Sequence, residues 1–335
     1  MQNYNVSKNR SGMFEIRLAP MCGITDYIFR TLCYEQGCDL AYTEMISAMG
    51  YLCAPGQRAT QELMIRGKKE PKLILQLFGK DPDTVAEAAR RICALGVYDG
   101  IDLNMGCPAK KIAPSGEGCG LMRVPDVARK MMEKTVSSCN VPVSVKMRLG
   151  YDDEHINAVE FARMAENAGI SSITVHGRTR AQQYGGSADW EMIAKVAESV
   201  HIPVCGNGDI LSADQALMRQ KNAHTHAVMI GRGAMGNPWI FREIKAAMNG
   251  QDIKPVTVPE KHNTIIRHYE MMLEAKPEPI AVREMRKHIG WYIKGMRDAA
   301  KFRSEINRCG ESRKAIAMID MFFENTDDAD ASAED

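Results

Sequence analysis

The sequence predicts an α/β protein, a (β/α)₈ or TIM barrel with a C-terminal all-α helical domain. Short apolar or β-branched runs, each followed by a helix-like stretch, recur eight times between Ile16 and Ile230. Several of these runs are apolar on both sides, as parallel strands covered by helices should be. Beyond about residue 245 the strand-like runs cease and the periodicity is helical. The 335 residues fit a barrel of roughly 250 residues with a small appendage.

Each β-α unit can be assigned from the sequence. The predicted strands are Ile16–Met21, Leu40–Met45, Leu73–Phe78, Gly100–Met105, Val141–Met147, Ile173–His176, Ile202–Gly206 and Ala227–Ile230. The predicted helices between them include Pro82–Leu95, Pro125–Val136, His155–Ala168, Trp190–Val200 and Ser212–Lys221. Ser, Asp or Pro residues mark several helix starts, and Gly96 and Gly169 mark two helix ends.

Composition divides the chain into four parts. Residues 1–13 form a polar lead-in, and residues 14–248 form the barrel. Gly250–Pro259 is polar, contains proline and is typical of a linker, and residues 255–323 form the helical domain. Residues 324–335 are acidic and low in complexity, so we expect a disordered tail.

The composition also excludes several classes of protein. No apolar run approaches the roughly 20 residues of a membrane span, and the N-terminus has no apolar signal segment. The ten cysteines are scattered, with no CxxC pair and no zinc spacing. We therefore expect a reduced, cytoplasmic protein that binds neither a membrane nor a metal.

Charge is distributed unevenly although the net charge is only +1. The segment from Arg283 to Lys314 contains ten basic and four acidic residues, whereas Glu324–Asp335 contains six acidic residues and no basic one. The near-neutral total thus hides a basic segment and an acidic tail.

Polar and glycine residues are concentrated after the predicted strands, where a barrel of this kind carries its chemistry. The segments are A-P-M-C-G-I-T-D (19–26), Q-L-F-G (76–79), D-L-N-M-G-C-P (102–108), K-M-R-L-G (146–150), V-H-G-R-T-R (175–180), G-N-G-D-I (206–210) and I-G-R-G-A-M-G-N-P (230–238).

The last two segments predict a phosphate site. Glycines let backbone N–H groups approach an anion, and Arg232 adds positive charge. A phosphate cup after strands seven and eight recurs in such barrels. Glycines after strands often only make turns, so Gly206–Asp209 or Gly231–Gly233 alone would be weak evidence. Their occurrence on consecutive strands is more specific.

Three further residues are candidates for chemistry. Lys146 ends a buried strand, where a charged group should be paired or functional. His176 could be a hydrogen-bonded core histidine, but the neighbouring Gly177 and Arg178 favour a cofactor contact. Cys107 lies in a polar loop at the predicted catalytic face, unlike the common buried cysteine. For Cys22, Cys119 and Cys205 we prefer the inert interpretation.

Together the seven segments resemble the tRNA-dihydrouridine synthase family, over a range from about Ile16 to Asn307. The pairing of N-M-G-C-P with V-H-G-R-T-R is highly specific. R-K-H-I-G-W-Y-I-K-G (286–295) is similar to the bacterial B-type branch. Two departures are Cys22, where many members have alanine, and Asp209, where many have glutamate. Neither departure removes a role.

The resemblance implies roles for individual residues. Cys107 would be the general acid, and Asn104, Arg148 and Arg178 would contact the substrate. The residues expected to hold FMN are Pro20, Met21, Cys22, Gln76, Lys146, His176, Asn207, Gly208, Asp209, Gly231 and Arg232.

The basic segment predicts an RNA-binding face. On a wheel at 100° per residue, one side carries Arg283, Arg286, Lys287, Lys294, Arg297, Lys301 and Arg308. The opposite side carries Val282, Ile289, Tyr292, Ile293, Met296 and Ala300. We assign Arg286, Lys287 and Lys294 to tRNA phosphates. A merely solvated charged face is the alternative, and Gly290 or Gly295 could break the helix.

The sequence therefore predicts a monomeric, FMN-dependent tRNA-dihydrouridine synthase reduced by NADPH or NADH. Hydride would pass from flavin N5 to uracil C6, and Cys107 would protonate C5. The target base would have to leave its stack.

One alternative is an FMN-dependent small-molecule oxidoreductase of the dihydroorotate or enone type. It gives no reason for the basic domain. Another is a non-catalytic RNA-binding protein on a retained barrel, which leaves Lys146, His176 and Cys107 unexplained.

Overall fold

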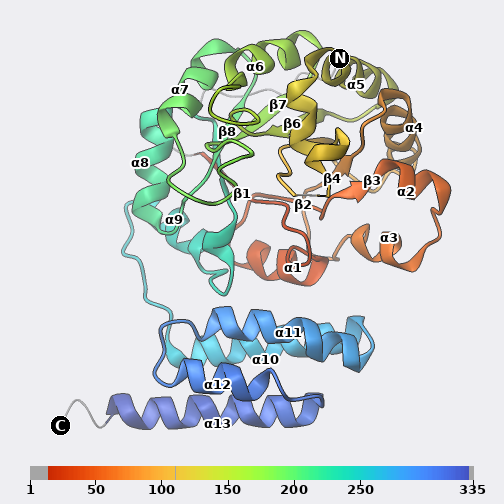
Figure 1. Cartoon of the computed structure of the whole chain (residues 1–335). Coiled ribbons are helices and arrows are strands. Elements are labelled where there is room, and N and C mark those ends of the chain that lie inside the picture. The colour runs from red at the N-terminus through yellow and green to blue at the C-terminus, as the bar shows by residue number, and fades with distance from the viewer. Residues whose placement is uncertain (1–13, 110, 332–335) are drawn as a thin grey trace.

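A closed parallel barrel forms the larger part of the molecule (Figure 1). The computed structural model describes residues 14–109 and 111–331, with side chains as far as Asn325, so the lead-in predicted for residues 1–13 lies outside the described residues. β2 pairs with both β1 and β4, which closes the sheet and confirms the predicted fold class. The strands are β1 (Glu15–Leu18), β2 (Leu40–Tyr42), β3 (Ile46–Ser47), β4 (Leu73–Phe78), β5 (Gly100–Met105), β6 (Val143–Met147), β7 (Ser172–His176), β8 (Val204–Asn207) and β9 (Ala227–Ile230).

Helices cover the outside of the barrel and alternate with its strands (Figure 1). They are α1 (Tyr27–Glu35), α2 (Ala48–Cys53), α3 (Arg58–Leu63), α4 (Pro82–Cys93), α5 (Pro125–Ser138), α6 (Ala158–Asn167), α7 (Trp190–Ser199), α8 (Ala213–Ala223) and α9 (Ile240–Met248). Asp81 and Ser212 cap α4 and α8 through their side chains. Gly96 and Gly169 adopt φ values of 65° and 85° just after α4 and α6, in agreement with their helix-end signals.

The second predicted strand, Leu40–Met45, is interrupted in the structure. Pairing stops after Tyr42 and resumes in β3, where Ile46 lies opposite Leu77 of β4. In the gap, the Thr43 hydroxyl accepts the backbone N–H of Gln76 at 3.0 Å. The side chain thus replaces a ladder bond. Sequence patterning does not reveal such an interruption, because Thr43 favours strands like its neighbours.

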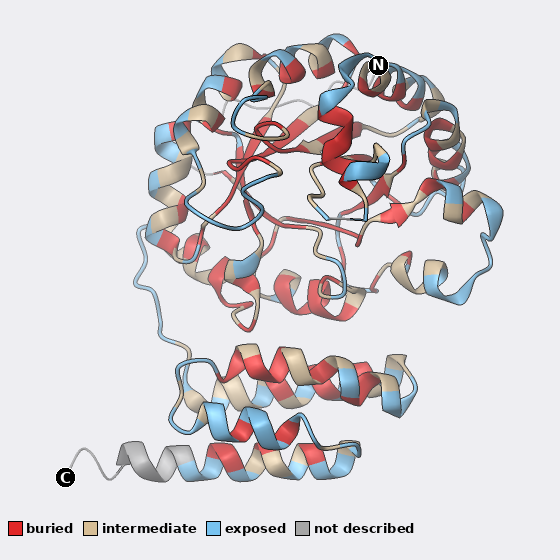
Figure 2. Ribbon diagram, in the orientation of Figure 1, coloured by how far each residue is buried: buried red, intermediate tan, exposed pale blue. Residues whose placement is uncertain are grey.

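Side-chain alternation along the strands decides what faces the barrel axis. On β5, Ile101 and Leu103 belong to the core packed under the outer helices, whereas Asp102 and Asn104 point inward. β6 repeats the pattern, with Val145 outward and Lys146 inward. The polar residues of the strand ends are therefore gathered inside the barrel, while apolar residues form the layer beneath the helices. Figure 2 shows that the strands and the inner sides of the surrounding helices are largely buried.

The helical domain packs beside α1 and α9 (Figure 1). It consists of α10 (Val258–Ala275), α11 (Glu278–Tyr292), α12 (Ala299–Ile306) and α13 (Ser312–Ala331). Its core cluster includes Ile28 of α1 and Trp239, which precedes α9. The ammonium of Lys276 also bonds Asp26, the N-cap of α1, at 3.0 Å. The domain and the barrel therefore share apolar and charged contacts.

The basic segment is not the single helix that the wheel assumes. α11 ends at Tyr292 and α12 begins only at Ala299. Gly295 lies between them with φ of 86°, a conformation that favours glycine, and Gly290 stays inside α11. The predicted continuous basic face is therefore wrong, because the turn rotates the residues after Ile293 away from those before it.

The C-terminal segment also differs from its prediction. The composition predicts disorder from residue 324, but α13 continues to Ala331, and residues 332–335 lie outside the described residues. Ile319 and Phe323 are buried in the domain core and anchor the helix just before the acidic stretch. Helix propagation from an anchored turn is favourable, which explains the continuation.

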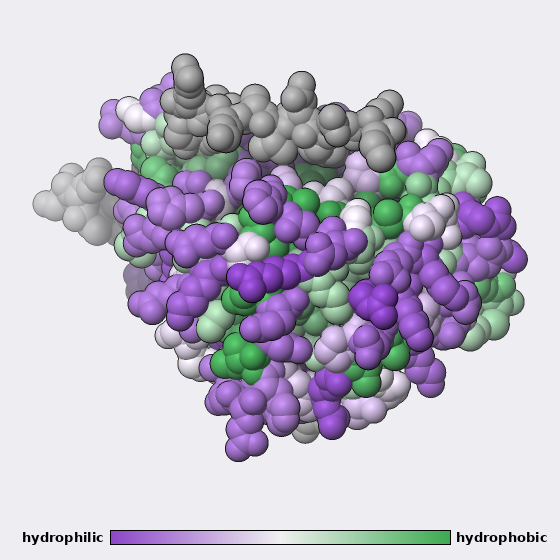
Figure 3. Space-filling model, turned by 90° about the horizontal axis from the view of Figure 1, so that it is seen from above, coloured by the Kyte–Doolittle hydropathy of each residue, from purple (hydrophilic) through white to green (hydrophobic). Residues whose placement is uncertain are grey.

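Hydrophilic side chains dominate the face seen from above (Figure 3). The exposed large apolar residues are scattered around the surface, for example Leu95, Leu211 and Met218. Among the described residues, none of the helices combines the length and the apolar character that crossing a bilayer requires.

Gly236 offers a test of the contact between barrel and helical domain. A Cβ atom there would overlap the backbone of Trp291, whereas one at Gly250 would meet nothing, and both glycines have φ near 65°. Gly236→Ala should therefore reduce the free energy of unfolding by about 1–3 kcal/mol more than Gly250→Ala. Thermal or urea unfolding of the two variants measures the difference. Equal losses would mean that only backbone strain is involved.

Candidate active site

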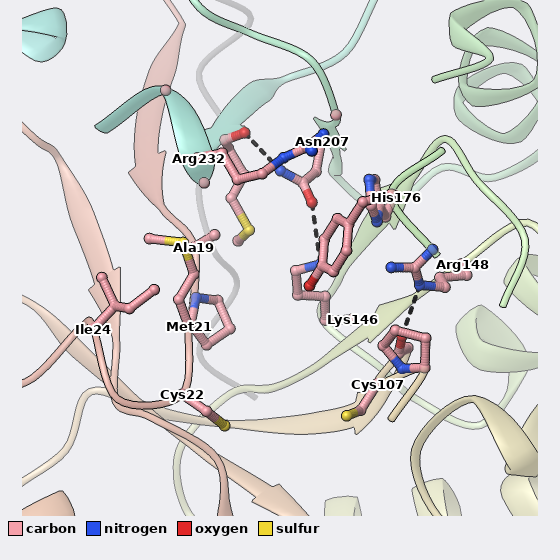
Figure 4. Close-up of a pocket in the computed structure, with 18 of the residues that line it drawn as sticks. Ala19, Met21, Cys22, Ile24, Cys107, Lys146, Arg148, His176, Asn207 and Arg232 are labelled. Carbon is pink, nitrogen blue, oxygen red and sulfur yellow. Dashed lines mark hydrogen bonds between the residues drawn. The ribbon is translucent and has the colours of Figure 1, made fainter. Parts of the chain in front are cut away.

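A cavity of about 900 Å³ opens at the carboxyl ends of the strands. Its volume is in the range of small-molecule and cofactor sites. It brings together all eleven residues predicted to hold a cofactor, and with them Asn104, Cys107 and Arg148. Figure 4 labels several of them, among them Lys146, His176 and Cys107. These residues come from seven different strand ends, so the barrel closure alone makes them neighbours.

The loops after β8 and β9 carry the glycines and the arginine of the predicted phosphate site. Gly208 has φ of 132°, and a Cβ there would lie 2.6 Å from Ala188. A Cβ at Gly233 would overlap the carbonyl oxygen of Ile210. Arg232 is half exposed beside these glycines and adds a cation. The backbone is thus packed so tightly at these two positions that only glycine fits.

Asp209 organises this site although it carries the same charge as an anion. Its φ of 50° is strained for a non-glycine residue. Burial would raise the pKa of this carboxyl, but two 2.8 Å bonds from Arg178 outweigh it, and the pKa is lowered. Asp209 also bonds Arg232 at 3.0 Å, which aims that guanidinium at the loop.

Arg178 corrects the prediction of a direct substrate contact. It is 1% exposed, does not line the cavity, and bonds the carbonyls of Gly185 and Gly186 besides Asp209. Arg178 cannot reach a ligand in the cavity because its side chain is buried under the loop after β7. Arg178 therefore positions Asp209 and that loop.

Lys146 places a positive charge on the floor of the cavity. Its ammonium bonds the Asn207 side-chain oxygen at 3.2 Å, and no carboxylate lies within ion-pair distance among the described residues. Burial lowers the pKa of Lys146 to about 8, and the nearby Arg148 adds to the effect. Such a cation suits an electron-rich or anionic group bound above it.

His176 lies beside this lysine and is a neutral imidazole. Burial first, and then the charges of Lys146 and Arg148, hold the pKa of His176 far below its usual value. The ring lines the cavity and lies 6.5 Å from the ring of Tyr184. A neutral ring keeps one N–H donor and one acceptor for a ligand.

Cys107 presents a thiol to the cavity from the loop after β5 (Figure 4). Its backbone N–H donates to the Asn104 side-chain oxygen at 2.9 Å, and its carbonyl accepts from the backbone N–H of Cys119 at 3.2 Å. Burial raises the pKa of the thiol above its usual value. The group is therefore protonated at neutral pH and can donate a proton.

Arg148 lies next to Cys107 and is fixed in place. It donates to the carbonyls of Gly106, Thr179 and Gln183 at 2.8–2.9 Å. Its guanidinium also lies 5.7 Å from the Tyr184 ring centre. It lines the cavity, and its bonds hold the loops after β5 and β7 together.

The three predicted RNA-contacting residues have different surroundings. Arg286 is tied into its own domain, since it donates to the Cys309 carbonyl at 2.8 Å and its Nε is buried without a partner among the described residues. Its assignment to a tRNA phosphate stays a prediction. Lys287 donates to the carbonyl of Gly23 in the loop after β1. Lys294 is exposed and lines the cavity.

Sequence reasoning missed Tyr184. It lines the cavity, is 57% exposed, and lies between Arg148 and Arg232, whose guanidinium is 5.0 Å from the ring centre. An exposed aromatic ring among cations suits stacking on a planar ligand. The glycines that follow it, Gly185 and Gly186, are the signal that the sequence offers.

Comparison with known proteins gives one family. The family model described as dihydrouridine synthase (Dus) matches residues 17–327. The chain is 36% identical over 311 residues to tRNA-dihydrouridine synthase B of Shewanella oneidensis, covering 92% of this chain and 95% of that one. It is 38% identical over 307 residues to tRNA-dihydrouridine synthase B of Pseudomonas aeruginosa, covering 91% and 92%.

A solved structure resembles the fold. Histamine dehydrogenase from Rhizobium sp. 4-9 superimposes with a TM-score of 0.56 at 14% identity, covering 77% of this chain and 49% of that chain. At this identity the likeness concerns the fold alone.

Proposed function

The chain belongs to the dihydrouridine synthase family, and from this premise we propose that it reduces the C5–C6 double bond of uridines in tRNA, with FMN and a nicotinamide as cofactors. Residues 14–248 would be the catalytic barrel and residues 255–323 the tRNA-binding domain. One observation supports this most strongly. The eleven expected flavin residues, the acid Cys107 and the expected uracil contacts Asn104 and Arg148 line one cavity.

The cavity fits FMN in particular. The tight backbone at Gly208 and Gly233, with Arg232 beside it, suits one phosphate group. Lys146 and the neutral His176 lie toward the barrel axis, where the ring would bind. When bound, the flavin supplies the reducing equivalents for the uracil double bond.

The residues of the chain do the remaining work. Lys146 would place its positive charge near the bound flavin, and Asn207 orients that ammonium at 3.2 Å. Arg148 and Asn104 orient the uracil. The Cys107 thiol holds the proton that C5 requires once C6 has been reduced. Tyr184 offers a stacking surface at the mouth of the cavity.

The experiment that tests this function uses unmodified tRNA transcript, FMN-loaded protein and NADPH or NADH. We expect dihydrouridine in the digested RNA by mass spectrometry, and none when NAD(P)H is omitted. A protein that oxidises the nicotinamide but leaves RNA unchanged would contradict the proposal and favour the small-molecule oxidoreductase. A protein that binds tRNA but neither flavin nor nicotinamide would favour a binding role.

The pKa of Lys146, about 8, predicts a pH dependence of FMN binding. The folded-state value lies below that of a free lysine, so the ammonium is charged below pH 8 and neutral above it. FMN affinity of the flavin-free protein should therefore fall above pH ~8, by up to about tenfold per pH unit. Fluorescence titration from about pH 7 to 9.5 measures this. Lys146→Arg stays charged over this range, so its FMN affinity should change little with pH. If Lys146→Arg shows the same fall in affinity as the wild type, Lys146 is not the group that titrates.

The position of Lys294, exposed at the edge of the cavity, suggests that tRNA approaches the cavity from this side. Lys294→Glu should weaken tRNA binding and reduce the salt dependence, by about 0.7–0.9 in the slope of log affinity against log salt for each phosphate that the protein no longer neutralises. Lys254→Glu, an equal charge change on the exposed linker, is the control. Filter binding at several salt concentrations measures both variants. Equal effects would mean that only net charge matters.

A further inference from the structure

Three polar side chains form a hydrogen-bonded chain inside the barrel, beside the cavity. Gln76 of β4 and Asn104 of β5 line the cavity, whereas Asp102 of β5 lies behind them and is fully buried. Gln76 bonds both of the others, so the chain runs from Asp102 through Gln76 to Asn104. Nothing in the proposed mechanism uses Asp102.

The loop end of the chain fixes the orientation of the first amide. The Asn104 side-chain oxygen accepts backbone N–H groups from Gly106 at 3.2 Å and Cys107 at 2.9 Å. Backbone N–H groups can only donate, so the oxygen of Asn104 must face them. The amide nitrogen of Asn104 then faces Gln76 and donates to its oxygen at 2.8 Å.

The buried end fixes the second amide in the same sense. Since the Gln76 oxygen accepts from Asn104, its nitrogen faces Asp102 and donates to Oδ2 at 2.7 Å. The other carboxylate oxygen of Asp102 accepts from the Ser144 hydroxyl at 2.6 Å. Burial raises the pKa of Asp102 to about 6, so at neutral pH it is an ionised acceptor at both oxygens.

Both amide oxygens are therefore occupied within the protein, and N–H groups remain for the cavity. The Asn104 nitrogen has only the Met45 sulfur, at 3.5 Å, as a further partner among the described residues. Sulfur is a weak acceptor. This N–H is thus available to a ligand that offers an oxygen.

We propose that Asp102 is a positioning residue which, from the buried end and together with the backbone N–H groups of Gly106 and Cys107 at the loop end, holds Gln76 and Asn104 in the orientation presenting the Asn104 N–H to the C4 carbonyl of the target uracil. The inference rests on the proposed function. The same orientation disfavours cytosine, which carries an amine at C4 and would place a donor against a donor. Asp102 acts only through the two amides, since it does not reach the cavity.

The test pairs a change in the protein with a change in the substrate atom. tRNA transcripts carry either uridine or 4-thiouridine, whose C4 sulfur is a weak acceptor. The measured quantity is the rate of reoxidation of pre-reduced flavin without oxygen, as a uridine to 4-thiouridine ratio. Intrinsic reactivity cancels when ratios are compared between variants, as in a double-mutant cycle.

Asp102→Leu removes the acceptor that orients Gln76, so the ratio should fall about three- to tenfold below the wild-type ratio. Asp102→Asn can still face Gln76 with its oxygen and Ser144 with its nitrogen, so it should keep most of the wild-type ratio. Ser144→Ala is the matched control, because it deletes an equally buried bond to the same carboxylate without cutting the chain. It should also keep the ratio.

Flavin content, melting temperature and flavin reduction by NADPH are measured for each variant, and a merely structural role would move these without moving the ratio. A folded Asp102→Leu with the wild-type ratio would overturn the proposal, and so would a Ser144→Ala ratio as low as that of Asp102→Leu.

If Asp102→Leu does not fold, the double variant Asp102→Asn, Ser144→Ala decides. In this variant the amide introduced at position 102 loses the Ser144 hydroxyl that would orient it. An unchanged ratio there overturns the proposal. Wild-type protein that makes no dihydrouridine would instead contradict the function itself.

Discussion

Cys107→Ala is expected to lose uridine reduction by about 10²- to 10⁴-fold while still binding flavin and accepting electrons from NADPH. Reduction of uracil at C6 leaves negative charge at C5, which must receive a proton. The thiol of Cys107 faces the cavity and is protonated, because burial raises its pKa above the usual value. Cys107→Ser should also be poor, since a hydroxyl is a much weaker acid. Anaerobic reoxidation of the reduced flavin by unmodified tRNA isolates this step.

Cys22 provides the matched control for this prediction. It also lines the cavity, and its sulfur points toward that of Cys107 (Figure 4). Burial raises its pKa to about 11, so both thiols are protonated. Because many members of the family have alanine at this position, Cys22→Ala should stay near the wild-type rate. Equal losses in the two variants, or full activity of Cys107→Ala, would place the acid elsewhere, with Lys146 as the next candidate.

Arg232→Glu is expected to weaken FMN binding on the order of a hundredfold, because it replaces an attractive charge beside the phosphate by a repulsive one. The guanidinium lies over the glycine loops and is held by Asp209 at 3.0 Å. Flavin retained after dialysis and fluorescence titration of the flavin-free protein both measure the effect. FAD released from wild-type protein would contradict the single-phosphate site.

A graded series separates charge from structure. Arg232→Lys keeps the positive charge and should bind FMN within about tenfold of wild type, and Arg232→Gln should fall between Lys and Glu. Melting temperatures of the flavin-free variants reveal any destabilisation from breaking the bond to Asp209. Should Gln and Glu bind equally well, the phosphate does not lie near this side chain.

The sequence by itself determined the barrel and most of the candidate site. Eight apolar runs with helix-like stretches between them leave few other arrangements, because parallel strands need crossover helices of that length. The residues at their ends must then share one rim. For this reason Lys146, His176 and Arg232 can be grouped from the sequence alone, although they are far apart in the chain.

Only the tertiary structure decided which of these polar groups are free and which are already paired. Arg178 and Arg286 look like ligand contacts in the sequence. In the folded chain, however, Arg178 bonds Asp209, and Arg286 donates to the carbonyl of Cys309. A wheel drawn on the sequence assumes one continuous helix, and the turn at Gly295 breaks that assumption.

The inward chain from Asp102 through Gln76 to Asn104 is equally invisible in the sequence. Gln76 is far in the sequence from Asp102 and Asn104, and only the register of β4 against β5 brings Gln76 opposite Asp102. Periodicity records which face of a strand a residue occupies, but not which neighbour it bonds. The sequence thus determined the fold and the rim, and the packing of the strands decided the direction of each hydrogen bond, because an amide orients only when its partners are in place.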